Sequence, residues 1–146
     1  MNQGGSAETE VACAHDVVFY DGGCGLCHRW VRFVVPRDRA GRFRFAPLQG
    51  TTITQRLDAA ARQSLPDSIV LLAGDGTQRI KSDAALAILA GLGSGWRVLA
   101  TMGRVVPRCL RDGVYDRIAK VRHKLLARPS EACPLMPREL RARFLP

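Results

Sequence analysis

Two cysteines spaced as Cys-Gly-Leu-Cys, Cys24 and Cys27, are the residues of this chain best suited to chemistry. If the pair opens a helix, the two Cβ atoms lie about 5–6 Å apart, close to the 3.5–4.5 Å or so that a disulfide needs. The unpaired N–H groups and the dipole at a helix start favour the thiolate, which is the attacking form of cysteine. We therefore predict that Cys24 attacks a substrate and that Cys27 resolves the mixed disulfide.

The segments on either side of the pair predict how it is positioned. Residues Val17–Tyr20 form a short apolar run that is typical of a buried strand. Gly22 and Gly23 then supply a turn, and residues His28–Val35 carry apolar side chains at helical spacing. The expected order is a strand, a glycine turn, and a helix that begins at or next to Cys24.

Two polar neighbours of the pair allow alternative roles. Asp21 lies three positions before Cys24 and would either relay a proton to or from Cys27 or accept hydrogen bonds from the N–H groups of the turn. A carboxylate that only forms the turn explains the same residue without catalysis. His28 would stabilise a neighbouring thiolate, or it is a solvated helix residue.

A Cys-x-x-Cys pair is also half of a zinc site, because structural zinc takes four ligands. The other two ligands would have to come from His28, His123, Cys109 or Cys133, and the chain has no second closely spaced pair. We therefore expect no metal and no cofactor. A third class, a non-catalytic interaction domain, predicts that both cysteines can be replaced without loss of function.

Composition sets the broad class of the protein. The chain has 146 residues, of which 47% are hydrophobic and 24% charged, as expected for one globular domain. It shows no secretory signal, and its longest apolar stretch, residues 84–92, is too short to span a bilayer. A cytoplasmic location follows as the expectation. In that compartment a close cysteine pair is more often catalytic or metal-binding than structural.

The net charge of +9 is carried almost entirely by arginine, since lysine occurs only at Lys81, Lys120 and Lys124. Such an excess is compatible with a nucleic-acid partner. The sequence has no helix-turn-helix, zinc-finger or RNA-binding signature, so we favour a solvated basic surface over a nucleic-acid site. The charge would also steer acidic thiol partners towards the protein.

The remaining pattern alternates strands and helices. We predict a strand at 43–48, a helix at 51–64, a strand at 68–72, a turn at 74–76, a strand at 77–81 and a helix at 84–92 capped by Ser82 or Asp83. The resulting β-α-β-α-β-β-α order predicts an α/β fold with a mixed sheet and helices on both faces. It is similar to the order of the thioredoxin fold, in which the cysteine pair follows the first strand.

Three regions are expected: a flexible tail at 1–16, a thioredoxin-like core at 17–92, and a C-terminal helical extension at 93–146 packed on the core. The extension would hold helices at 96–106 and 114–126 and a short last helix from Pro137 to near Leu145. Thioredoxins place a cis-proline opposite the cysteine pair. Pro66 is the corresponding candidate, with Asp67 and Ser68 as alternative substrate-facing residues.

The segment Tyr20–Cys27 resembles the signature of the DCC family of thiol-disulfide oxidoreductases. The likeness continues through residues 39, 41–49, 67–71, 82–85, 106–107, 111–112, 114–116, 133 and 143–145. The resemblance implies a thioredoxin-like fold and a redox role, with Asp21, Cys24 and Cys27 as motif residues. Its partners would be a protein or small-molecule thiol or disulfide and a thiol electron donor or acceptor. The chain departs from the family pattern at Val121 and His123.

Overall fold

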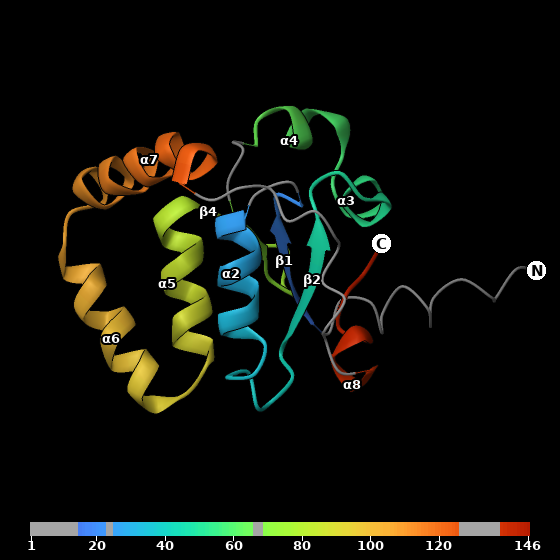
Figure 1. The fold of residues 1–146 in the computed structure, drawn as a ribbon, viewed down its shortest axis with the longest axis horizontal. Coiled ribbons are helices and arrows are strands. Elements are labelled where there is room, and N and C mark those ends of the chain that lie inside the picture. Colours follow the sequence, from blue (N-terminus) through green and yellow to red (C-terminus); the bar gives the residue numbers. More distant parts are fainter. Residues whose placement is uncertain (1–14, 23–24, 66–68, 126–137) are drawn as a thin grey trace, which may run out of the picture.

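A computed structural model of the chain describes residues 15–22, 25–65, 69–125 and 138–146. Its centre is a four-stranded mixed sheet in the order β2-β1-β3-β4 (Figure 1). The strands are β1 (Asp16–Tyr20), β2 (Phe43–Pro47), β3 (Val70–Leu72) and β4 (Gln78–Ile80). β1 pairs parallel with β2 and antiparallel with β3, and β3 pairs antiparallel with β4. The predicted mixed α/β sheet is confirmed and is consistent with a thioredoxin-like fold.

Helices surround this sheet. They are α2 (Gly25–Val34), α3 (Thr51–Arg56), α4 (Ala59–Gln63), α5 (Lys81–Gly91), α6 (Ser94–Val105), α7 (Arg108–Leu125) and α8 (Arg138–Arg141). Figure 1 shows α2 and α5 side by side over one face of the sheet, with α6 and α7 farther out. α6 packs against α5, and α7 contacts both α5 and α2.

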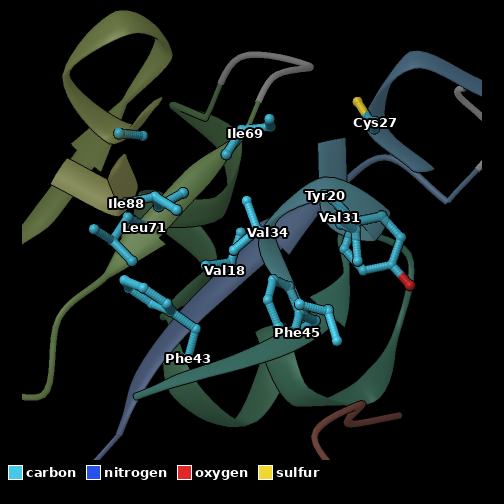
Figure 2. Packing of buried hydrophobic residues seen from close by; sticks show 12 residues of the cluster. Val18, Tyr20, Cys27, Val31, Val34, Phe43, Phe45, Ile69, Leu71 and Ile88 are labelled. Carbon is cyan, nitrogen blue, oxygen red and sulfur yellow. The ribbon is translucent and has the colours of Figure 1, made fainter. Parts of the chain in front are cut away.

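The alternation of side chains along β1 explains why both faces of the sheet are covered. Val18 and Tyr20 point to the face that α2 and α5 cover, where they join the cluster shown in Figure 2. Val17 and Phe19 point to the opposite face and pack with Ile53 of α3. Because successive side chains of a strand point to opposite sides, an uninterrupted apolar run is buried only when both sides are covered.

The helix predicted at 51–64 is two short helices. Leu57 adopts extended dihedral angles after α3, and Asp58 then caps α4 by accepting a hydrogen bond of 2.7 Å from the backbone N–H of Ala61. An aspartate whose side chain satisfies the first N–H groups of a helix favours a new helix start. The sequence prediction treated Asp58 as an ordinary helical position and missed the break.

The predicted cap of α5 is wrong. The helix begins at Lys81, which has a positive φ of 52°, and its N-cap residue, Ile80, gives no side-chain hydrogen bond. Ser82 instead donates to Asp112 of α7, and Asp83 accepts from Arg111. Both polar side chains therefore attach α7 to α5.

The outer helices also differ in their bounds from the prediction. α7 begins at Arg108 rather than at Val114, because the backbone N–H groups of Leu110 and Arg111 bond to the Pro107 carbonyl and continue directly into the helix. α8 is shorter than the expected segment from Pro137 to Leu145. The expected tail falls largely outside the described residues, and Asp16 already belongs to β1.

The last described residues run beside β2 and close one edge of the sheet. The Phe45 N–H donates to the Arg143 carbonyl at 2.8 Å, and the Leu145 N–H donates to the Phe45 carbonyl at 2.7 Å. Their side chains also pack, since the rings of Phe45 and Phe144 stack with centroids 5.5 Å apart. Pairing along the β2 edge satisfies backbone groups that would otherwise be left open.

Asp38 joins this C-terminal segment to the turn between α2 and β2. Its side chain is fully buried and accepts hydrogen bonds from the N–H groups of Arg42 and Phe43 at 3.1 and 3.0 Å. The Arg143 guanidinium lies 3.5 Å from the same carboxylate and donates to the Asp38 carbonyl at 3.0 Å. Arg143 thus supplies the positive charge that a buried carboxylate needs.

We expect Asp38→Ala to lower the free energy of unfolding by about 2–4 kcal/mol, because two backbone donors would lose their acceptor and the Arg143 guanidinium its opposing charge. Urea unfolding followed by circular dichroism measures the change. Asp58→Ala is the matched control, since it removes an exposed cap worth about 1 kcal/mol. Equal losses in the two variants would contradict the structural role given to Asp38.

Candidate active site at the start of α2

Cys27 occupies the first turn of α2 and is only 3% exposed. α2 begins at Gly25, the residue after Cys24, so the predicted helix start next to Cys24 is confirmed. Figure 2 shows Cys27 at one end of the buried cluster, beyond Tyr20 and Val31. Cys24 lies outside the described residues, and its attacking role stays a prediction.

The turn between β1 and α2 is held by the side-chain amide of Gln49. The Gln49 Nε2 group donates to Asp21 Oδ1 at 2.9 Å, and its Oε1 accepts from the Gly22 N–H at 3.2 Å. A Cβ atom on Gly22 would lie 3.3 Å from that Oε1 atom, so a larger residue there would have to move the amide by a few tenths of an ångström. Asp21, predicted as a proton relay or a turn acceptor, thus accepts a bond from a side chain on the neighbouring loop.

His28 ties the first turn of the helix back to the same turn. Its Nε2 atom lies 2.8 Å from the Gly22 carbonyl oxygen, and because a carbonyl can only accept, Nε2 carries the proton in this bond. The imidazole also meets the Tyr20 ring edge to face, with centroids 5.6 Å apart. His28 therefore positions the turn, a role that neither sequence alternative included.

The sequence pattern did not predict that Gln49 holds the turn before the cysteine pair. A signal for it exists, because β1 and β2 are parallel and Tyr20 is in register with Pro47. The residues that follow two parallel neighbouring strands emerge at the same sheet edge. Asp21 follows one strand and Gln49 the other, so a predicted β1–β2 register would have brought the two side chains together.

An apolar pocket of about 430 Å³ opens beside Cys27, between α2 and α7. Its lining residues are Cys27, Arg29, Trp30, Phe33, Ile69, Ala85, Tyr115, Ile118 and Ala119. The volume falls within the range of about 300–1,000 Å³ that is typical of ligand sites. Arg29 is the charged residue of this lining, and a group held here would lie against the Cys27 side of the pair.

Tyr115 lines the pocket and also contacts the residue that precedes β3. Its hydroxyl accepts a hydrogen bond of 3.1 Å from the backbone N–H of Ile69, directly before β3. The predicted substrate-facing residues Pro66, Asp67 and Ser68 lie outside the described residues, immediately before Ile69. α7 is therefore joined to the chain at Ile69, directly before β3.

The described residues do not bring a third metal-ligating side chain to Cys27, since no group of three His, Cys, Asp or Glu side chains gathers among them. Of the ligands proposed for a zinc site, His28 bonds to the Gly22 carbonyl and Cys109 is exposed on α7. Cys133 lies outside the described residues, as does the side chain of His123.

Comparison with known proteins gives consistent results. The sequence profile of the DCC1-like thiol-disulfide oxidoreductase family matches residues 18–128. The chain is 37% identical over 134 residues to the uncharacterized protein YuxK of Bacillus subtilis, covering 89% of this chain and 93% of the relative. It is 31% identical over 119 residues to the DCC family protein At1g52590, chloroplastic, of Arabidopsis thaliana, covering 82% and 69%. No solved structure matches the chain.

We expect Gln49→Leu to loosen the turn before Cys24, since both bonds of the amide are lost while its size is kept. Hydrogen exchange of the Gly22 amide should accelerate about tenfold, the effect of losing one backbone hydrogen bond. Gln55→Leu, the same change at an exposed position of α3, is the control and should leave this amide unchanged. Unchanged exchange in Gln49→Leu would show that the turn does not depend on Gln49.

Proposed function

Because the chain belongs to the DCC1-like thiol-disulfide oxidoreductase family, we propose that Cys24 and Cys27 exchange disulfides with a thiol or disulfide substrate. The observation that carries the proposal is the position of Cys27, which is buried in the first turn of α2 and lines an apolar pocket. The turn before the pair is held by two side chains, Gln49 and His28. Such support favours a fixed geometry for the pair.

The reaction proceeds in two exchanges. The Cys24 thiolate attacks one sulfur of the substrate disulfide, forms a mixed disulfide and releases the other sulfur as a thiolate. The Cys27 thiolate then attacks the Cys24 sulfur, closes the intramolecular disulfide and releases the second substrate thiolate. The substrate gains two electrons and the cysteine pair loses two. Two equivalents of an external thiol, which leave as a disulfide, return the pair to its reduced form by the same two exchanges, and the reverse sequence oxidises a dithiol substrate.

The partners in this proposal are a protein or small-molecule thiol or disulfide, together with a thiol electron donor or acceptor. A cytoplasmic location is part of the proposal, since reduced thiols prevail there. In this proposal the basic surface steers acidic partners towards the protein, and we propose no nucleic-acid site on it.

Cys24→Ser should lower the rate of disulfide exchange at least about 1,000-fold, because the hydroxyl cannot replace the attacking thiolate. Cys27→Ser should instead accumulate a mixed disulfide with the substrate. Reduction of glutathione disulfide measures the rate, and mass spectrometry detects the adduct. Cys109→Ser removes an exposed cysteine of α7 and serves as the control with unchanged activity.

Two outcomes would overturn this proposal. Exchange at the normal rate in the variant lacking both Cys24 and Cys27 would favour a non-catalytic interaction domain. Stoichiometric zinc in the purified protein, lost from that same variant, would favour a structural metal site.

The Asp21→Asn variant distinguishes the two roles predicted for Asp21, formation of the turn and proton transfer. The substituted side chain keeps the oxygen that accepts the 2.9 Å bond from Gln49 but loses the negative charge. If the carboxylate relays a proton for Cys27, the resolving step should slow about 100-fold and the pH profile of exchange should shift. Stopped-flow measurement of intramolecular disulfide closure across pH tests this. A normal rate and profile would leave Asp21 with the turn-forming role alone.

A further inference from the structure

The described residues with large, exposed apolar side chains are all found on α6, α7 and the short link between them. They are Val98, Leu99, Met102, Val105, Val106, Leu110, Val114, Ile118 and Val121, here called the α6–α7 face. Val105 is 82% exposed and Met102 65%. Scattered exposed apolar residues need no explanation, but a set confined to one pair of helices marks an interaction surface.

α6 is apolar on two opposite sides. One side packs on the core: Ala100 is fully buried, and a Cβ on Gly103 would lie 2.8 Å from a methyl group of Leu86. The other side of α6 faces away from the core. It carries the exposed residues Val98, Met102 and Val105, which are three or four positions apart and so share one side of the helix. The protein core therefore accounts for the first side only.

α7 repeats this arrangement. Arg111, Asp112 and Tyr115 face inward, since they bond to Asp83, Ser82 and Ile69. The apolar residues of α7 recur every three or four positions on a different side of the helix, at Leu110, Val114, Ile118 and Val121. Ile118 also lines the pocket beside Cys27, so the pocket adjoins the α6–α7 face.

The charges on these two helices are strongly biased. Residues 94–121 contain six arginines and lysines but only two carboxylates. Arg97, Arg104, Arg117 and Lys120 are exposed beside the apolar residues.

Both carboxylates bind groups of the protein itself. Asp112 pairs with Arg108 and accepts from Ser82, and Asp116 pairs with Lys81 at 3.0 Å. The hydrogen bond from the Ser82 hydroxyl stabilises the charged form of the Asp112 carboxyl and lowers its pKa below the usual value. The exposed charge around the α6–α7 face is therefore positive.

We propose that the α6–α7 face binds the surface of an anionic lipid bilayer. Aliphatic side chains enter the boundary between headgroups and acyl chains, and the flanking arginines and Lys120 meet lipid phosphates. A second copy of the chain would bring positive charges against positive charges, which disfavours a symmetric dimer through this face. Among the described residues no helix is both long and apolar enough to cross a membrane.

Co-sedimentation of the full chain with vesicles tests the proposal. Vesicles of phosphatidylcholine mixed with phosphatidylglycerol should bind the protein, pure phosphatidylcholine vesicles should bind it much less, and added salt should weaken binding. The double variant Val98→Asp, Met102→Asp should bind at least about tenfold less tightly, because two apolar side chains are lost from the contact. Thr54→Asp, on exposed α3, adds the same kind of charge elsewhere and should bind normally.

A second pair of variants tests the charge requirement separately. Arg104→Gln and Arg117→Gln should each weaken binding to the phosphatidylglycerol vesicles about fivefold, the effect of one cation near an anionic surface. Arg141→Gln on α8 is the control, since Figure 1 shows α8 near the β2 edge of the sheet, on the opposite side of the picture from α6 and α7.

The rate of disulfide exchange, measured without vesicles, tests the proposed function of the cysteine pair independently of lipid binding. This rate should be unchanged in all of the variants of α6, α7 and their controls. Equal binding to both kinds of vesicle would overturn the proposal. Absence of binding would also overturn it, with light scattering then showing whether two copies join through this face.

Discussion

Burial of β1 on both faces is the constraint on which the rest of this structure depends. Val17 and Phe19 lie under one layer and Val18 and Tyr20 under the other, and none of the four is more than 8% exposed. A strand of this kind must be central, so β2 and β3 flank it and helices must cover both sides of the sheet. α2 follows directly and lies on the same face as Val18, which places its first turn at the end of β1.

The candidate site lies where this central strand ends. Parallel pairing of β1 with β2 brings the loop after each strand to one edge, and Gln49 then bonds to the turn that precedes Cys24. His28 holds the same turn from the helix side. Open sheets commonly place their functional groups at such edges, because the strand ends are fixed in position and the loops that follow them converge there.

The outer helices connect the site to the surface. On its inner side, α7 bonds through the Tyr115 hydroxyl to Ile69, directly before β3. On its outer side, Val114 and the neighbouring apolar residues are exposed. Ile118 belongs both to the pocket beside Cys27 and to the α6–α7 face. A surface contact through α6 and α7 would therefore lie next to the pocket beside Cys27.

The sequence by itself determined the features that depend on local pattern: the strand–glycine turn–helix unit around Cys27, the succession of strands and helices along the chain up to α5, and the family resemblance. Hydrophobic periodicity and turn residues specify these over a few positions. Only the tertiary structure decided that Gln49 holds the Gly22 turn, 27 positions away, and that Arg143 neutralises Asp38, 105 positions away. Such partners depend on strand register and on which elements pack together. The position of a glutamine or an arginine in the sequence follows no periodic pattern that would identify its hydrogen-bond partner.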